Sequence, residues 1–406
     1  MLSIRQALEL MLPHFQPRGT ERVPLLEAGG RVLGQDVEVS VALPEFDHSA
    51  MDGYAFRAGD VQAEQRLSIS GESRAGGHPQ PLAAGTVQRI LTGAPMPAGA
   101  DTVVIQENTR RSGAELVIHS LPPKAANVRT RGSELQPGQL LLAAGARLGP
   151  SEIGLLASQS LAEVEVYRRP RVAILPTGDE LRALTDPPRP YSIVDSNTYA
   201  VATALTEAGC VAVPLASARD DLGELGRRIA EGLALDLLLT IGGVSVGDHD
   251  YVEEALRAAG VEVGFHKVAI KPGKPLLFGT RGTTPVVGLP GNPVSALITF
   301  EVFVRPCLLR MQGHPAVFPE PIEVMLAEPY RHAAGRTELL RAELERVSGG
   351  WQARLRRQQG SAALSSLAGP TALVIAPAQR TEFAQGERMA ALLLAPARRV
   401  DSPFED

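Results

Sequence analysis

The chain has 406 residues, of which 44% are hydrophobic, and a formal net charge of −5. That length corresponds to two or more domains, and the apolar content is sufficient for several cores, which excludes a disordered chain. The acidic balance argues against a general nucleic-acid-binding protein, and no apolar run approaches the ~18 residues of a membrane helix.

The N-terminal segment, MLSIRQALELML, predicts an amphipathic helix with Ser3 and Gln6 at capping-box spacing. It lacks the small-residue cleavage site of a secretory signal. Cys210 and Cys307 lie far apart and outside any zinc or redox motif, so we interpret both as buried apolar residues in a protein of the reducing cytoplasm.

Residues 53–138 consist of short β-prone segments broken by glycine and proline, which predicts a small β domain. It lies between residues 1–52 and residues 139–169. We expect these two flanking segments to pack together as one discontinuous N-terminal domain, with the β domain inserted into it.

Residues 170–318 have a different pattern, in which short apolar runs alternate with amphipathic stretches. This alternation predicts an α/β domain with a doubly wound, mostly parallel sheet. The expected strands are 171–175, 211–215 and 235–241, and the expected helices are 198–208, 222–233, 252–259 and 294–310. Residues 319–406 again contain short strands and predict a C-terminal β barrel or sandwich.

The basic residues are unevenly distributed along the chain. Only four of the 40 are lysines, and three of these, Lys267, Lys271 and Lys274, fall in the segment KVAIKPGKP. An arginine-rich composition explains the rarity of lysine but not the cluster. A lysine ammonium can bind a phosphate or another oxyanion as a point charge, and a solvated strand face is an equally good interpretation from composition alone.

Three loops at the expected carboxyl ends of strands carry polar residues suited to ligand binding. PTGDEL places Glu180 after the first strand, although an acid there could also cap a helix. In GGVSVGDHDYV, three glycines permit close backbone approach to a ligand, and acids could hold Mg²⁺ against phosphate oxygens. The residues of interest in this second loop are Gly242, Gly243, Ser245, Gly247 and Asp250.

The third loop, LPGNPVSA, places Asn292 at the N-cap and Pro293 at the first position of the last helix. The free N–H groups of such a helix start attract anions. Asp220, which follows another strand, adds a carboxylate to the same edge. Together the loops predict a phosphorylated ligand and Mg²⁺ in a crevice at the sheet edge.

Seven motifs in order resemble the molybdopterin molybdenumtransferase (MoeA) family, to which the gephyrin E domain is related. They are PEFDHSAMDGYA, LTGAPMPAGADTVV, PTGDEL, DSN, GGVSVGDHDY, KVAIKPGKPLLFG and GLPGNPVSA. The resemblance spans essentially the whole chain and is looser in the last β domain. This chain differs from the family at the end of the inserted domain, where the family has the pattern RGEDI and this sequence has RGSEL, with Ser133 and Glu134.

The resemblance implies an activity and an assembly. The family inserts molybdenum from molybdate into adenylyl-molybdopterin with Mg²⁺-dependent release of AMP, giving Mo-molybdopterin. It forms a homodimer whose active site combines both subunits, and other proteins of molybdenum cofactor biosynthesis are expected partners. No nucleic-acid or membrane partner is implied. Tungstate instead of molybdate stays open, because the two oxyanions are nearly isosteric.

The resemblance also implies roles for individual residues. The catalytic set comprises Asp52, Thr92, Glu180, Asp220 and Asp250, of which the last three would hold the metal. The substrate-binding set comprises Gly242, Gly243, Ser245, Gly247, Lys271, Lys274, Pro290, Asn292, Pro293, Ser295, Arg336, Arg341 and Ser361.

Two other functions remain as alternatives. A molybdopterin adenylyltransferase uses a related α/β domain, but the additional domains and their MDGY and TGAP motifs disfavour it. A non-catalytic scaffold is disfavoured because the full set of active-site motifs is present.

Overall fold

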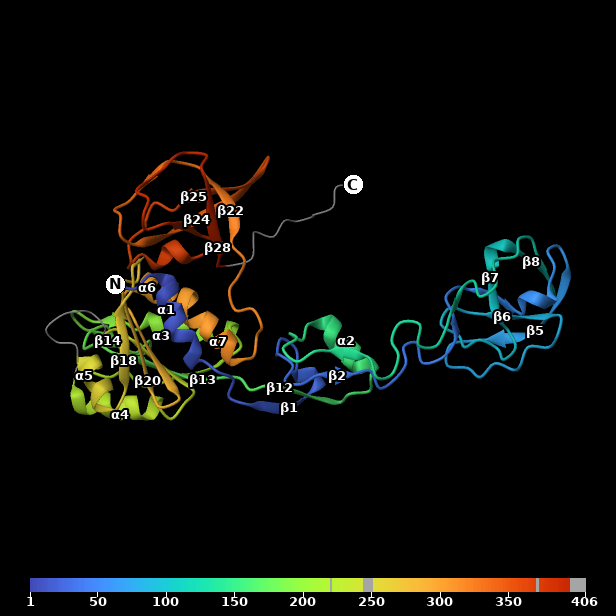
Figure 1. Ribbon diagram of the computed structural model, residues 1–406, viewed down its shortest axis with the longest axis horizontal. Coiled ribbons are helices and arrows are strands. Elements are labelled where there is room, and N and C mark those ends of the chain that lie inside the picture. Colours follow the sequence, from blue (N-terminus) through green and yellow to red (C-terminus); the bar gives the residue numbers. More distant parts are fainter. Residues whose placement is uncertain (220, 244–250, 370–371, 395–406) are drawn as a thin grey trace.

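The computed structural model describes residues 1–219, 221–243, 251–369 and 372–394. The chain forms an elongated molecule, with the α/β unit and the C-terminal barrel at one end and the inserted β domain at the other (Figure 1). A small N-terminal unit connects the two ends. The predicted positions of Ser245, Gly247, Asp220 and Asp250 lie outside the described residues.

The α/β unit contains a six-stranded sheet with the order β16-β13-β17-β21-β20-β18. The first four strands run parallel, and β20 alone runs in the opposite direction, because it pairs antiparallel with both β21 and β18, so the sheet is mostly parallel as predicted. The central strands are buried on both faces and therefore have continuous apolar sequences. The bounds are β13 Arg171–Pro176, β16 Val211–Pro214, β17 Leu237–Ile241, β18 Glu262–Lys267, β20 Pro275–Arg281 and β21 Thr284–Leu289.

Helices cover both faces of this sheet. Apolar residues of α3, α6, α7 and the N-terminal α1 form one core, and those of α4 and α5 form the other. Helix α1, from the start of the chain, packs on the α/β unit, where its Ala7 and Met11 are fully buried. The bounds are α1 Ile4–Met11, α3 Ser196–Glu207, α4 Leu222–Gly232, α5 Tyr251–Ala258, α6 Pro293–Thr299 and α7 Arg305–Met311.

The N-terminal unit is built from two segments that are separate in sequence. Strand β1 (Thr20–Pro24) pairs with β12 (Glu163–Tyr167), and β2 (Val37–Glu38) pairs with β11 (Leu140–Leu142). Helix α2 (Pro150–Ser158) has proline at its first position and packs on this small core. The chain thus leaves this unit after β2 and returns to it at β11, and the inserted domain lies between these two strands in the sequence.

The inserted domain is a six-stranded sheet with the order β7-β4-β6-β5-β9-β8, next to a short β3–β10 pair. Its core is small and independent of the α/β unit. The bounds are β3 His48–Ser49, β4 Gly53–Phe56, β5 Arg66–Ser73, β6 Thr86–Ile90, β7 Thr102–Ile105, β8 Thr109–Ser112, β9 Glu115–Ile118 and β10 Val128–Arg129.

The C-terminal domain is a barrel closed by β24, β25, β22, β28 and β26, because β26 pairs with both β28 and β24. Strand β19, which contains Lys271, leaves the α/β unit and pairs with β24, so the two domains share backbone hydrogen bonding. The bounds are β19 Ile270–Lys271, β22 Ile322–Leu326, β24 Thr337–Val347, β25 Gly350–Leu355, β26 Ala372–Ala376 and β28 Arg388–Leu393.

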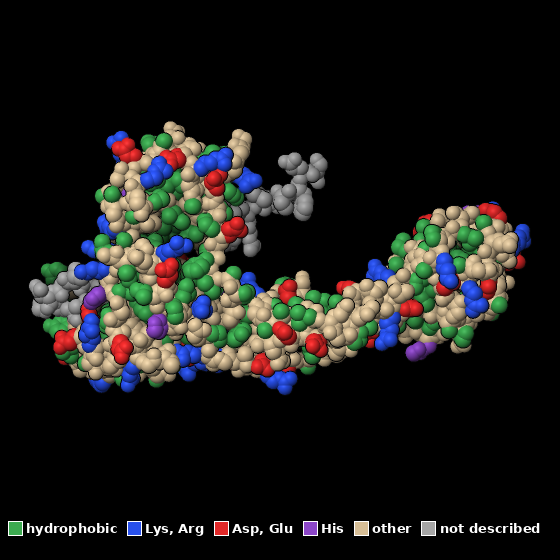
Figure 2. Space-filling model, in the orientation of Figure 1, with side chains coloured by type: hydrophobic (Ala, Val, Ile, Leu, Met, Phe, Trp, Pro, Cys, Tyr) green, Lys and Arg blue, Asp and Glu red, His purple; other side chains and the backbone are tan. Residues whose placement is uncertain are grey.

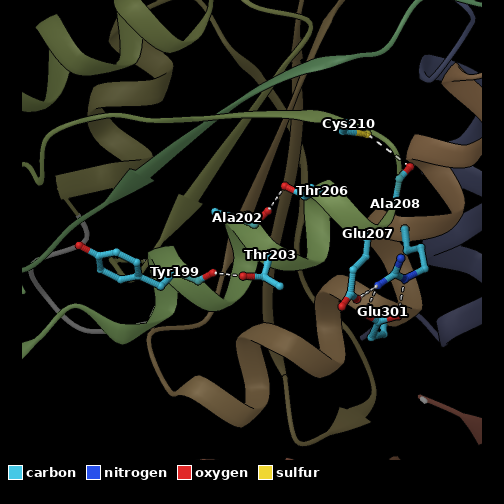
Figure 3. A network of polar contacts seen from close by, with 9 residues as sticks. Tyr199, Ala202, Thr203, Thr206, Glu207, Ala208, Cys210 and Glu301 are labelled. Carbon is cyan, nitrogen blue, oxygen red and sulfur yellow. Dashed lines mark hydrogen bonds and ion pairs between the residues drawn. The ribbon is translucent and has the colours of Figure 1, made fainter. Parts of the chain in front are cut away.

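Polar contacts fix the end of α3 against the last helices (Figure 3). Arg305 pairs with Glu301 at 2.5 Å and with Glu207 at 3.8 Å. Cys210 lies just beyond α3, and burial raises the pKa of its thiol to about 12. Cys307 is also buried, so both cysteines are the buried apolar residues that the sequence predicted.

The surface carries interspersed charges of both signs on the face shown in Figure 2. No large single-sign patch is seen there, in agreement with the small net charge of −5. Among the described residues, no helix is long and apolar enough to cross a membrane.

Candidate active site

A pocket of about 620 Å³ opens at the carboxyl ends of β13, β17 and β21. This is where ligands bind in doubly wound sheets, and the sequence analysis expected a crevice there. The pocket brings together segments far apart in the sequence, including one residue of the C-terminal domain. The lining includes Thr177, Gly178, Glu180, Asp195, Asn197, Gly242, Gly243, Pro275, Pro290, Asn292, Pro293 and Ala362.

The two glycines after β17 are required by the local geometry. Gly242 has φ +92° and Gly243 has φ +61°, a region that side chains disfavour. A Cβ on Gly242 would lie 2.6 Å from the Thr177 carbonyl oxygen, and one on Gly243 would overlap the Val252 side chain. Glycine is therefore required at both positions by backbone conformation and by close packing against Thr177 and Val252.

The first predicted acid, Glu180, is exposed and lines the pocket. Its carboxylate lies against Gly178, where a Cβ would overlap it. The neighbouring Asp179 and Asp221 line a second hollow beside the pocket, and Asp221 caps α4 by accepting from the Glu224 N–H at 2.8 Å. Of the predicted metal-binding acids, the structure therefore describes Glu180 alone.

The loop before α6 forms the wall opposite Glu180. Asn292 occupies the N-cap position, as predicted, but its side chain makes no capping bond and is exposed. Instead, the Ser361 carbonyl oxygen of the C-terminal domain accepts from the Val294 N–H at 3.1 Å. Ser295 is buried within α6, so its hydroxyl lies behind the pocket wall.

The lysine segment lies where the α/β unit meets the barrel. Lys271 forms an ion pair with Glu338 of β24, with Nζ 2.8 Å from Oε1. Lys274 is exposed and its ammonium has no ion-pair partner in the part of the chain that the structure describes. The Val268 N–H donates to the Lys274 carbonyl at 3.0 Å, and the next residue, Pro275, lines the pocket.

The three predicted residues of the barrel differ in their surroundings. Arg336 is half-buried just before β24, and Ser361 is partly exposed beside α6. Arg341 is fully buried, and its guanidinium donates to Ser366 Oγ at 3.0 Å and to the carbonyls of Gln358 and Gly360. In this conformation Arg341 organises the loop that precedes Ser361, and it is not among the residues that line the pocket.

Asp52 and Thr92 form a pair of their own in the inserted domain. The Asp52 carboxylate accepts from the Thr92 N–H at 2.7 Å and from the Thr92 hydroxyl at 2.8 Å. These hydrogen bonds, the backbone one first, lower the pKa of Asp52 below its ordinary value. Both residues are exposed, and the inserted domain that contains them lies at the other end of the molecule from the α/β unit (Figure 1).

Comparisons with known proteins cover nearly the whole chain. Family models match at residues 2–160 (MoeA N-terminal region, domain I and II), 173–310 (probable molybdopterin binding domain) and 323–394 (MoeA C-terminal region, domain IV). A molybdopterin molybdenumtransferase of Nostoc sp. is 39% identical over 388 residues, covering 92% of this chain and 89% of the relative. The chain belongs to the molybdopterin molybdenumtransferase family.

Other relatives agree with this membership. A molybdopterin molybdenumtransferase of Haemophilus influenzae is 39% identical over 77% of this chain and 78% of its own length. A crystal structure of a molybdopterin biosynthesis MoeA protein from Pyrococcus horikoshii superposes with a TM-score of 0.83 at 30% identity, covering 97% of this chain and 99% of that chain. The predicted fold class and family are therefore confirmed.

Three residues had no role predicted from the sequence: two of them line the pocket, and the third, Glu338, pairs with Lys271. Asp195 lines the pocket and caps α3 by accepting from the Thr198 N–H at 3.0 Å. Asn197 donates to the Gly291 carbonyl at 2.7 Å and ties α3 to the wall loop. Both residues belong to the DSN motif, so that motif could have indicated them from the sequence. Glu338 had no signal, because its partner Lys271 is distant in sequence.

Proposed function

We propose that this protein inserts molybdenum from molybdate into adenylyl-molybdopterin, with Mg²⁺-dependent release of AMP, to give Mo-molybdopterin. The observation that carries the proposal is the pocket at the sheet edge, which unites the glycine turn, Glu180, the wall loop and the barrel in a chain of this family. The lysine segment adjoins that pocket through Pro275.

The phosphate groups of the organic substrate would bind beside the glycine turn and to the Asn292 side chain, which makes no capping bond. The Gly242 N–H is not available to them, because it donates to the Leu289 carbonyl at 3.1 Å. Molybdate is a dianion and binds cationic side chains. Lys271 and Lys274 lie on one segment, and Arg336 directly precedes the strand paired with it, so these three are the candidates to hold molybdate. Gly242, Gly243, Pro290, Pro293, Ser295 and Ser361 shape the walls.

The donor set in the pocket fits Mg²⁺. This ion binds through one or two carboxylates together with substrate phosphate oxygens, and Glu180 presents an exposed carboxylate toward the pocket. Asp220 and Asp250 are the further proposed ligands and lie outside the described residues. When bound, the ion would supply positive charge beside the pyrophosphate group.

We further propose a homodimer with a cross-subunit active site and a cytoplasmic location. Asp52 and Thr92 belong to the domain farthest from their own subunit's pocket (Figure 1). They can therefore assist catalysis there only if a second subunit presents them. Glu134, in place of the family's acidic residue at that turn, is exposed in the same half of the molecule and would act at the same interface.

The test is to incubate the purified protein with adenylyl-molybdopterin, Mg²⁺ and molybdate and to measure AMP. We expect AMP release that requires both the protein and molybdate. Release that is independent of molybdate, or none at all, would contradict the proposal. Replacing Lys271 and Lys274 together by arginine should raise the molybdate concentration needed for half-maximal AMP release, because a guanidinium presents its donors in a wider, planar arrangement.

A further inference from the structure

Glu338 is a buried carboxylate at the boundary between the two domains. Its side chain is 3% exposed, whereas that of its partner Lys271 is 46% exposed. Removing a carboxylate from water costs several kcal/mol unless other groups compensate it, and an apolar residue would stabilise a barrel interior at least as well. Barrel stability alone therefore does not account for a carboxylate at this position.

We propose that Glu338 is a positioning residue that fixes the Lys271 ammonium for oxyanion binding. The inference rests on the proposed function, in which Lys271 binds molybdate. A lysine side chain has about 2 kcal/mol of rotamer entropy, so holding one of its N–H groups lowers the cost of ordering the other two around a ligand.

The backbone supports this role. Lys271 and Glu338 are directly opposed in the parallel β19–β24 pairing, and the Thr337 N–H donates to the Ala269 carbonyl at 3.0 Å. The two side chains therefore start from strands that are held together, although they belong to different domains. The barrel thus places a buried carboxylate against a lysine whose side chain is 46% exposed.

A second layer of the barrel lies behind the carboxylate. The His332 ring is 2% exposed, with Nδ1 3.4 Å from Glu338 Oε2, and lies between the rings of Tyr330 and Phe383. Glu338 Oε2 has no hydrogen-bond partner among the described residues, so the ion pair that Oε1 forms with Lys271 is the carboxylate's closest polar contact. Burial, followed by the Glu338 charge, raises the pKa of Tyr330. The nearby Arg341 directs its guanidinium to other groups.

The test is titration calorimetry of the intact purified protein with sodium molybdate. We expect Glu338→Gln, which keeps the shape but removes the charge, to weaken molybdate binding roughly tenfold, as lost outer-shell contacts do at metal sites. In a Lys271→Ala background the same substitution should change nothing further. Glu343→Gln is the matched control, because Glu343 lies on the same strand and pairs with Arg356 in an exposed position.

The outcomes separate this inference from the function on which it rests. Weaker binding in Lys271→Ala with unchanged or tighter binding in Glu338→Gln overturns the inference alone. An equal loss in both backgrounds also overturns it, because Glu338 would then act through the barrel. Molybdate binding that Lys271→Ala leaves unchanged overturns the role of Lys271 as well. If Glu338→Gln does not fold, Tyr330→Phe replaces it, with a smaller loss expected and an unchanged affinity contradicting the role.

Discussion

The Asp52–Thr92 pair makes a prediction about acidity at a single residue. Thr92 donates two hydrogen bonds to the ionised Asp52, and the backbone one contributes more to the lowered pKa. Thr92→Val removes only the hydroxyl, so the pKa of Asp52 should rise part of the way toward its ordinary value of 3.8. Carbon-detected NMR titration of the Asp52 carboxyl measures this shift.

The sign of the pH dependence follows from the lowered pKa. The stabilisation that the ionised Asp52 gains from its hydrogen bonds with Thr92 is fully present above the ordinary pKa of an aspartate. It is lost as the pH falls through the lower pKa of the folded state. Thr92→Val should therefore lose the ionised carboxylate at a higher pH than the wild type. Asp101, which accepts from Ala58 and Thr102 in the same domain, should titrate unchanged. An unaltered Asp52 titration would refute the assignment.

The glycine turn gives a second prediction for a single residue. Gly243→Ala places a Cβ at positive φ and against Val252, whereas Gly282→Ala places one at φ +57° with nothing within 4 Å. We expect the first to lower local stability by about 2–3 kcal/mol and the second by about 1 kcal/mol, because only the first adds a clash to the backbone strain. Amide hydrogen exchange of β17 and β21 reports the local change. Equal effects would show that Val252 moves aside.

At the scale of elements, the loop between β25 and β26 depends on Arg341. Arg341→Lys keeps the charge but cannot reproduce the three guanidinium bonds, which leaves the Gln358 and Gly360 carbonyls unpaired at about 1–3 kcal/mol each. Amide exchange across residues 356–366 should therefore accelerate, and molybdate affinity should fall as Ser361 loosens from α6. Arg354→Lys on β25, an exposed position, is the control. No difference between the two variants would exclude this role.

The elements themselves were largely predictable from the sequence, because their signals are local. The expected helix at 222–233 is observed as Leu222–Gly232, and the Ser3–Gln6 capping box is present. The last expected helix spans Pro293–Met311, but a π-helical segment at Phe300–Val304 interrupts it. Periodicity does not distinguish such a segment from α-helix, since its apolar face stays buried.

The parts of the site that sequence could not predict are contacts between distant segments. Asn292 has the residue type and position of a capping residue, yet a carbonyl from the barrel takes the Val294 N–H. Glu338 comes next to Lys271 only because β19 pairs with β24, which are distant in sequence. Arg341 has the residue type of an anion ligand, but the fold buries it among carbonyls. Local pattern identified the loops, and tertiary pairing determined which groups face the pocket.

At the scale of the whole molecule, the separation between the inserted domain and the pocket gives the strongest constraint. A site that uses Asp52 from one subunit and Glu180 from another is incomplete in a monomer. Asp52→Ala and Glu180→Gln homodimers should each lose activity. A heterodimer with one substitution on each subunit, isolated through two different affinity tags, should recover about half of the wild-type activity, because one of its two sites is intact.

The reciprocal heterodimer provides the control, because it reverses the expected result. When one subunit carries both substitutions and the other carries neither, every cross-subunit site contains one defect, so AMP release should be absent. If each site were built from a single chain, this heterodimer would keep about half of the activity and the previous one would have none. Because the two arrangements predict opposite results from the same pair of substitutions, a defect in folding or affinity cannot imitate either pattern.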